Sequence, residues 1–229
     1  MLAPLCISAT CTNQTIVQVA LIGKGFRRLS AVTDGRALTR DERDLAALTV
    51  LALLTIGPRH PYDIHRLCVQ TRKDFVTGTP RSIYHAVTKL HKAYLIEPVG
   101  SEQDGGRPER TVFALTDAGR AEGRRRVAKL LATPQDDRTL TTAALSFLGI
   151  LSQGDAIAAM RARVAALASA LSIKDSDLAE AGHLPPILLV ETEYERDQLR
   201  AEHDWFDTLA GRLESGEIPW GLPPATAEL

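Results

Sequence analysis

Residues 78–115 decide the fold, and they read GTPRSIYHAVTKLHKAYLIEPVGSEQDGGRPERTVFAL. The first half predicts a helix, because its apolar residues recur at spacings of three and four and form one stripe. The second half predicts a β-hairpin from two short runs, Leu95–Val99 and Arg110–Thr116, joined by a loop that contains glycines and arginines. A helix followed directly by such a hairpin is the order of a winged helix-turn-helix. The stripe comprises Ile83, Val87, Leu90 and Tyr94.

The side chains outside this stripe are basic or can form hydrogen bonds. Basic side chains bind phosphates, and hydroxyl and imidazole groups can reach base edges in a major groove. We therefore predict that this helix and the hairpin loop bind double-stranded DNA; the alternatives are a solvated helix face and a face that meets another protein. The predicted contacts are Thr79, Arg81, Ser82, Tyr84, His85, Thr88, Lys89, Lys92, Arg107 and Arg110. Within this set we expect phosphate contacts from Lys89, Lys92, Arg107 and Arg110, and contacts near bases from Ser82, Tyr84, His85 and Thr88.

Two further helices are predicted before this stretch. Asp41, Glu42 and Asp44 indicate a helix start, because the helix dipole favours negative charge there. The segment Leu45–Leu54 is apolar nearly all round, which predicts a helix that is buried on most sides. Pro61 suits the first turn of the second helix, where a missing N–H costs nothing.

The stretch from about Leu45 to Leu131 resembles the PadR family of transcriptional regulators. The matching pieces are LTVLALLTIGPRHPYDI, TPRSIYHAVTKLHKAYLIE and GRPERTVFALTDAG, followed by an acidic helical tail. Two departures stand out: Pro61 occupies a position where the family usually has glycine, and Ala93-Tyr94 replaces a pair that usually ends in glycine. The resemblance implies a homodimer made by the C-terminal helices and regulation by a small molecule, since family members include repressors released by phenolic acids or hydrophobic drugs.

The chain after Thr133-Pro134 is acidic and predicts an all-α region, in which Arg138–Leu151 is expected to form one helix. The next helix carries a seam of two heptads, for which packing within the subunit and a dimer contact are equal alternatives. A long helix is predicted from Ile187 to Leu213, with two apolar lines, so that one can serve the subunit and the other a partner. The seam comprises Ile157, Met160, Val164, Leu167 and Leu171; the lines are Val190, Tyr194, Ala201 and Trp205, and Leu199, Phe206, Leu209 and Leu213.

Three aromatic residues of the long helix are candidates for an effector site. Tyr194, Trp205 and Phe206 can stack on a planar ligand of the kind that the resemblance implies. The alternative is that these aromatic side chains belong to the core of the helical region.

The net charge of −1 hides an uneven distribution along the chain. Residues 1–130 carry twenty Lys and Arg against twelve Asp and Glu, whereas residues 131–229 carry seven against sixteen. This division fits a basic DNA-binding part joined to an acidic partner module, although chance can also produce it.

Other sequence features favour a cytoplasmic protein without catalytic chemistry. The three cysteines form no disulfide framework, which favours a reducing compartment, and no apolar run or signal peptide suggests a membrane. No catalytic motif stands out, so we expect no enzyme activity and no cofactor. A metal sensor is the disfavoured alternative, and we predict no metal site. That alternative rests on His60, His65, His85 and His91.

Together these patterns predict a mainly α protein: a winged helix-turn-helix with a two-stranded wing, followed by an all-α C-terminal dimerisation domain. The expected parts are a loosely attached or disordered extension at 1–36, a DNA-binding domain at 37–132 and a helical dimerisation domain at 133–229. The predicted function is that of a sequence-specific transcription regulator, a homodimeric repressor released by an aromatic or hydrophobic effector. The alternative is a winged-helix protein-interaction module that does not bind DNA.

Overall fold

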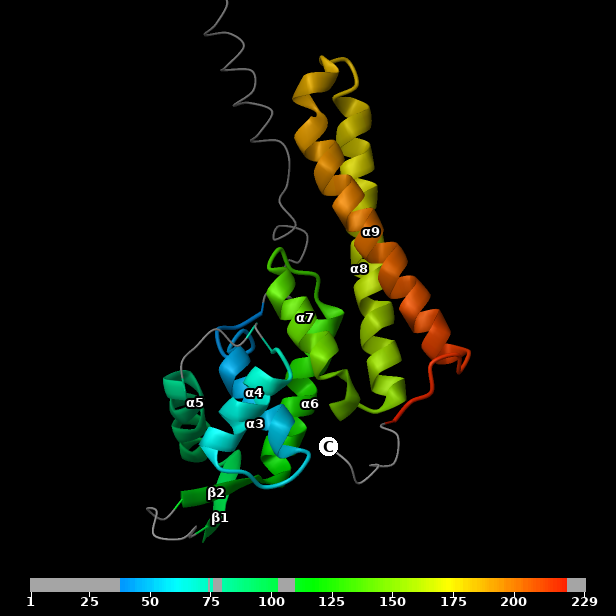
Figure 1. Ribbon diagram of the computed structural model, residues 1–229. Coiled ribbons are helices and arrows are strands. Elements are labelled where there is room, and N and C mark those ends of the chain that lie inside the picture. Colours follow the sequence, from blue (N-terminus) through cyan, green and yellow to red (C-terminus); the bar gives the residue numbers. More distant parts are fainter. Residues whose placement is uncertain (1–37, 74, 76–79, 103–109, 222–229) are drawn as a thin grey trace, which may run out of the picture.

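The computed structural model describes residues 38–73, 75, 80–102 and 110–221, and the predicted extension at 1–36 lies outside these ranges. The described chain is mainly helical and contains one two-stranded antiparallel sheet, which confirms the predicted fold class (Figure 1). The elements of the winged part are α3 (Leu45–Leu54), α4 (Pro61–Gln70), α5 (Pro80–Lys92), β1 (Ile96–Glu102), β2 (Arg110–Leu115) and α6 (Asp117–Ala132). The elements that follow are α7 (Arg138–Ser146), α8 (Gln153–Glu180) and α9 (Val190–Glu214).

The helix α3 lies at the centre of the fold, between two hydrophobic clusters. All residues from Ala47 to Leu54 are buried, as the sequence predicts. Leu48 and Ala52 belong to a cluster shared with α6, α7, α8 and α9, whereas Val50 and Leu54 belong to a cluster shared with α4 and α5. A helix covered on both sides needs apolar residues all round, and this explains its composition.

The two wing strands lie close to the predicted runs, and β2 is the better anchored of the two. On its outer side Phe113 exchanges two backbone hydrogen bonds with Arg59, both of 3.0 Å. The N–H and C=O of Phe113 both bond to Arg59, so neither is directed at β1. Pro98, the residue of β1 that pairs with Phe113, therefore occupies a non-hydrogen-bonded position of the β1–β2 ladder. The missing N–H of Pro98 therefore leaves no ladder bond unmade.

The helix predicted over Arg138–Leu151 is shorter than expected. It ends at Ser146, and a 3-10 turn (Leu148–Ile150) follows Phe147. Phe147 is only 5% exposed, and its ring packs edge-on against Phe75 with centroids 5.7 Å apart. Leaving the helix at this point allows the ring to enter the core, which the sequence pattern did not show.

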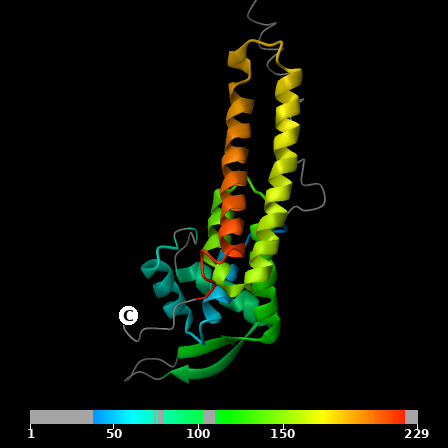
Figure 2. The same cartoon turned by 90° about the vertical axis from the view of Figure 1, so that its right-hand side faces the viewer.

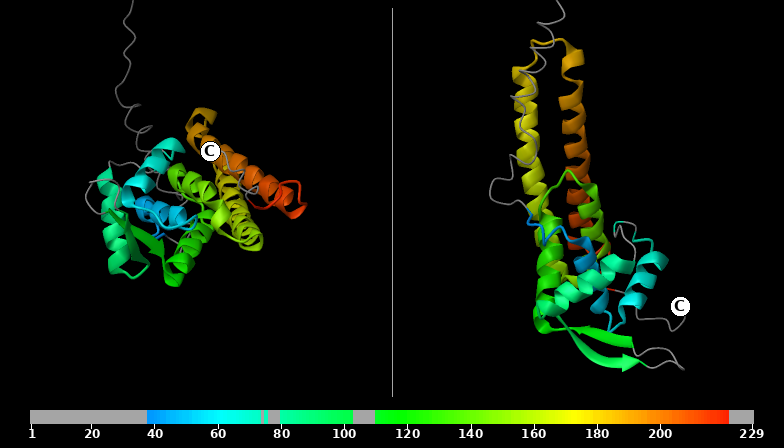
Figure 3. Two further views of the ribbon diagram at one scale, coloured as in Figure 1. Left: turned by 60° about the horizontal axis from the view of Figure 1, so that its bottom comes forward. Right: turned by 90° about the vertical axis from the view of Figure 1, so that its left-hand side faces the viewer.

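The helices α8 and α9 form a long antiparallel hairpin (Figure 2). The heptad seam of α8 faces α9 in the same chain: Met160 packs in one cluster with Phe206 and Leu213, and Leu167 packs with Leu199. Packing within the subunit is therefore the role that the structure shows for this seam. The free tip of the hairpin and the wing lie at opposite ends of the molecule (Figure 3).

Within the described residues, α8 is the one helix long and apolar enough to cross a membrane by length and composition alone. The sequence pattern did not suggest a run of this kind. Arg163, near the middle of α8, is completely buried and hydrogen-bonded to α9 through Glu202 and to α7 through Thr141. Such contacts are those of a core helix in a folded protein.

The end of α5 differs from the prediction at Tyr94. This residue is not part of the apolar stripe, because it follows the helix, is 82% exposed and has a left-handed backbone with φ of 58°. The N–H of Leu95 bonds to the carbonyl of Leu90 at 3.0 Å, and the N–H of Tyr94 bonds to that of His91 at 3.0 Å. These two bonds form a Schellman motif, whose left-handed position usually holds glycine.

We therefore expect Tyr94→Gly to raise the free energy of unfolding by about 1 kcal/mol, because a side chain in left-handed backbone costs that order of energy. Urea denaturation with an unchanged m-value measures the effect. Ala93→Gly is the matched control: Ala93 has no left-handed φ, so glycine there should lower stability. Equal losses from both variants would contradict the prediction.

Candidate nucleic-acid interface

The buried side of α5 determines which of its side chains face outward. Pro80 is the first helical residue, and Ile83, Val87 and Leu90 are buried against α3 and α4. With about 100° between successive residues, the positions opposite this stripe form the outer surface of the helix. Four of the predicted DNA contacts lie there, and all are exposed: Arg81, His85, Thr88 and Lys92.

Tyr84 lies on the flank of α5 that faces the start of α4. Its ring is 43% exposed and meets the His60 ring edge-on, with centroids 6.3 Å apart. His60 is itself placed by its role as the N-cap of α4, where its Nδ1 accepts a hydrogen bond from the N–H of Tyr62 at 3.1 Å. The start of α4 therefore contributes aromatic groups beside the outer surface of α5.

Arg110 is the first residue of β2 and pairs with Glu102 at the end of the ladder that adjoins the wing loop. Its guanidinium lies over the ring of Tyr62, 5.8 Å from the centroid, which is a cation–π geometry. Arg110 as a whole remains partly exposed in this position beside α4. Two further predicted contacts lie outside the described residues: Thr79 near the start of α5 and Arg107 in the wing loop.

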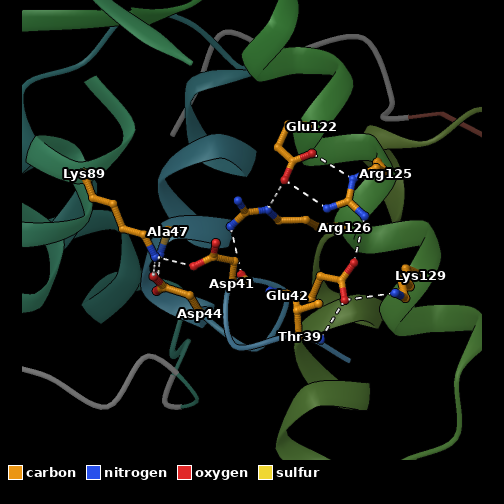
Figure 4. Close-up of polar contacts among 10 residues, drawn as sticks. All are labelled: Thr39, Asp41, Glu42, Asp44, Ala47, Lys89, Glu122, Arg125, Arg126 and Lys129. Atoms are coloured by element: carbon orange, nitrogen blue, oxygen red, sulfur yellow. Dashed lines mark hydrogen bonds and ion pairs between the residues drawn. The ribbon is translucent and has the colours of Figure 1, made fainter. Parts of the chain in front are cut away.

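The remaining two predicted contacts, Ser82 and Lys89, lie on the opposite flank of α5 and are half-buried. The Lys89 ammonium is 2.9 Å from a carboxylate oxygen of Asp41 and 2.9 Å from one of Asp44 (Figure 4). These hydrogen bonds raise the pKa of Lys89 and lower that of Asp41. The structure thus gives Lys89 two partners inside the protein, a role that the sequence did not suggest.

Residues 50–125 match the model of the transcriptional regulator PadR-like family. This match lies within the winged part of the chain. It confirms the resemblance to the PadR family seen in the sequence, and the proteins of that family are transcriptional regulators. No curated protein matches the chain.

The solved structures that match this chain include Bacillus subtilis PadR in complex with operator DNA and a PadR-like transcriptional regulator from Bacillus cereus. The first shares 17% identity with this chain, covers 73% of it and 98% of its own length, and has a TM-score of 0.33. The second shares 15% identity, covers 74% of this chain and 98% of its own, and has a TM-score of 0.32.

The arginine cluster at the middle of α6, Arg124 to Arg126, is largely engaged within the protein. Arg125 bonds to Glu122 at 2.8 Å and to Glu42 at 2.7 Å. Arg126 is 5% exposed and donates to a Glu122 oxygen at 2.6 Å and to the carbonyl of Asp41 at 3.0 Å. These contacts make the cluster a structural joint rather than a free basic surface.

Glu42 is the centre of this joint. Its carboxylate accepts bonds from Arg125, Thr39 and Lys129 at 2.7, 2.8 and 3.0 Å. Burial alone would raise the pKa of Glu42, but the bond from Arg125, followed by those from Thr39 and Lys129, outweighs burial and lowers the pKa to about 2. The carboxylate is therefore ionised at any physiological pH, and it binds the turn before α3 to α6.

Of the three candidate effector residues, the structure brings Trp205 and Phe206 together: their rings meet edge-on with centroids 4.9 Å apart. Tyr194 lies about three helical turns earlier on α9. Phe206 is 2% exposed in the core, where the Arg163 guanidinium lies 4.7 Å from its ring centroid. Tyr194 is 65% exposed and lines a groove of about 510 Å³ between α7, α8 and α9, whereas Trp205 is 51% exposed and does not line it. Phe206 is thus a core residue, as the alternative reading held.

The structure also adds residues that sequence reasoning missed. The sequence pattern explains Asp41 and Asp44 only as favourable charge at a helix start, whereas in the fold they also hold Lys89, which lies 48 and 45 residues away. Tyr62 carries no local signal of its contact with Arg110, since the two meet only through the fold. Among the described residues, no group of three or more His, Cys, Asp and Glu side chains is arranged to hold a metal ion.

Proposed function

We propose that this chain is a cytoplasmic DNA-binding transcription regulator that places α5 in a major groove and the wing against the adjacent backbone. The observation that carries this proposal is the outer surface of α5, where Arg81, His85, Thr88 and Lys92 are exposed together. No acidic residue occurs in α5, so nothing on the helix itself repels phosphate. Arg110 and the tyrosines at the start of α4 extend this surface toward the wing.

The alternative, a winged helix that binds another protein, is less well supported by this surface. Protein interfaces are centred on large apolar or aromatic side chains, whereas Tyr84 is the one such residue exposed on α5. Basic and hydroxyl groups fit phosphates and base edges better.

A binding series in rising salt separates the two functions. Fluorescence anisotropy with DNA fragments from the region upstream of the chain's own gene should show affinity that falls steeply with salt, because bound phosphates release counterions. Arg81→Ala and Lys92→Ala should each reduce the slope of log K against log salt by about one. Arg200→Ala, which removes a 50%-exposed arginine from α9, is the matched control and should leave the slope unchanged. A flat salt response would exclude the DNA-binding function.

We also propose that the protein acts as a homodimer through its helical hairpin. Side chains of α9 divide into three faces: a buried face with Leu199 and Phe206, a charged face with Glu193 and Arg200, and an exposed apolar face. The exposed apolar face corresponds to the predicted line of Val190, Tyr194, Ala201 and Trp205. Its large members are Val190, Tyr194 and Trp205, which are 51%, 65% and 51% exposed. A second copy of the chain would cover this face and would place two α5 helices about one DNA turn, or roughly 34–36 Å, apart.

We expect Trp205→Glu to convert the dimer to a monomer, because it places a charge within the apolar face of α9. Sedimentation velocity at micromolar protein measures the change, and DNA affinity should fall by about a hundredfold as the second half-site contact is lost. Glu193→Lys alters the charged face instead and should leave the dimer intact. A wild-type chain that sediments as a monomer, or an unaffected Trp205→Glu dimer, would contradict the proposal.

Repression and release by an aromatic or hydrophobic effector complete the proposed function, and the family resemblance supports both. A reporter gene behind the bound fragment tests the direction of regulation.

The effector site is proposed at Tyr194 and Trp205 on the exposed face of α9, with Phe206 excluded because it is buried. The chain has two tryptophans, so Trp220→Phe isolates the emission of Trp205. If a panel of planar aromatic compounds leaves this emission unchanged, the effector proposal fails.

A further inference from the structure

The turn before α3 carries acidic groups directly beside the proposed DNA-binding helix. Asp41 and Asp44 hold the ammonium of Lys89 between them, each at 2.9 Å (Figure 4). We call this arrangement, Asp41, Asp44 and Lys89, the acidic clasp. The ammonium of Lys89 already donates hydrogen bonds to two carboxylates, so in the free protein these carboxylates occupy donors that could otherwise bind a DNA phosphate.

The geometry of the clasp is fixed by the fold, because Asp41 and Asp44 are both held in place by hydrogen bonds that do not involve Lys89. Asp44 is the N-cap of α3, and its other carboxylate oxygen accepts a hydrogen bond from the N–H of Ala47 at 3.0 Å. The carbonyl of Asp41 accepts a hydrogen bond from Arg126 of α6 at 3.0 Å. Glu42, between them, is 2% exposed and is bound to Arg125 and Lys129 of the same helix. The turn is therefore attached to α6 and cannot move away from α5 freely.

The clasp lies directly beside the proposed DNA-binding surface of α5. A groove of about 390 Å³ separates the start of α3 from the flank of α5, and Asp44 shares its lining with Arg81, Ser82 and His85. The Lys89 side chain is 39% exposed and that of Asp41 is 63% exposed, so both can be reached from solvent. Like charges placed against phosphate oppose binding and suppress unwanted partners.

We infer that the acidic clasp is an internal competitor of DNA: Asp41 and Asp44 neutralise Lys89 in the free protein and thereby weaken binding to DNA of arbitrary sequence. This inference rests on the proposed DNA-binding function. Affinity for a correct site then depends on the outer residues of α5, while the clasp keeps the sequence-independent phosphate contribution low. Asp41 and Asp44 are specificity-determining residues in this sense, although neither contacts a base.

Neutralising the clasp should increase non-specific binding. We expect Asp41→Asn/Asp44→Asn to bind a random-sequence duplex of about 30 base pairs roughly tenfold more tightly at about 0.15 M salt, with a salt slope steeper by about one. Asparagine keeps the N-cap of α3, so the fold is retained, and circular dichroism melting checks this. Lys89→Gln alone should weaken binding of this duplex, because it leaves the carboxylates of Asp41 and Asp44 without their cation. Adding Lys89→Gln to the double variant should remove most of the gain.

A second measurement does not involve DNA. Limited acetylation followed by mass spectrometry should label Lys89 slowly in the wild-type chain and several-fold faster in the double variant, with Lys92 as an exposed reference on the same helix. Equal labelling of Lys89 in both proteins would overturn the clasp. A gain in affinity that persists in the triple variant would also overturn it, since the carboxylates would then act without Lys89. A wild-type chain that binds no duplex while Lys89 labelling changes as expected would refute the proposed function and leave the clasp as a structural contact only.

Discussion

Arg163→Ala should lower the free energy of unfolding by about 3–5 kcal/mol, the cost of leaving a buried charged network without its centre. The side chain of Arg163 is fully buried in α8. Its Nη1 group donates to three backbone carbonyls at the end of α6, those of Leu130, Leu131 and Thr133, at 3.2, 3.1 and 3.0 Å. Cationic donors at a helix C-terminus are favourable because they satisfy carbonyls that lack helical partners.

The same guanidinium reaches the other two helices of this region. Its Nη2 group donates to Thr141 of α7 at 2.8 Å and to Glu202 of α9 at 2.5 Å. Burial lowers the pKa of Arg163 and the Glu202 charge opposes this, but an arginine remains charged in either case. One residue therefore holds the end of α6, α7 and α9 around α8, and its loss leaves Glu202 and three carbonyls without their donor.

Urea denaturation of matched variants tests this prediction. Arg161→Ala is the control, since Arg161 lies on the same helix but pairs with Glu214 and Asp207 on the surface, where solvent screens the interaction. We expect a much smaller loss from Arg161→Ala than from Arg163→Ala. Arg163→Lys should recover only part of the stability, because an ammonium cannot reproduce the planar set of five donors. Equal losses from Arg161→Ala and Arg163→Ala would contradict the prediction.

Gly119→Ala should cost about 3 kcal/mol, at the upper end of overpacking effects, because there is no space for a side chain at this position. A Cβ on Gly119 would lie 1.9 Å from the carbonyl oxygen of Leu95. That oxygen belongs to the backbone between α5 and β1, so it cannot rotate away as a side chain would. Gly119 also lies in the first turn of α6, where its N–H bonds to the cap residue Thr116 at 3.0 Å.

The same substitution should weaken DNA binding beyond its effect on stability, because displacing Leu95 shifts β1 relative to α5. Anisotropy measured well below the unfolding midpoint separates the two effects. Gly154→Ala is the matched control: Gly154 also lies in the first turn of a helix, but a Cβ there meets nothing within 4 Å. Alanine at Gly154 should be neutral or slightly stabilising. A Gly119→Ala variant as stable as wild type would show that the contact between α6 and Leu95 can relax.

Much of the fold could be predicted from local patterns. The all-round apolar character of α3 indicates its burial on both sides, and the stripe of α5 identifies the outer surface of that helix. The two apolar lines of α9 correctly separate a buried from an exposed face, because helical periodicity alone determines which residues share a side. The family resemblance rests on the same local features and is confirmed by the match over residues 50–125.

Other features of the fold could not be predicted from local patterns, because they depend on contacts with residues distant in the sequence. The break at Phe147 follows from a place in the core that only the fold creates, and Tyr94 leaves the apolar stripe because α5 ends just before it. Thr79 and Arg107 lie outside the described residues, and the roles of the remaining DNA contacts stay predictions.

The sequence by itself determined the winged helix-turn-helix, its outward basic face and the apolar line of α9, because periodicity and charge are local properties of the chain. Only the tertiary structure decided which charges are free. Lys89 is held by Asp41 and Asp44, while Arg81 and Lys92 remain exposed, although all three basic residues look alike in the sequence. The physical reason is that an ion pair depends on distance in space, and the partners of Lys89 lie 48 and 45 residues away along the chain.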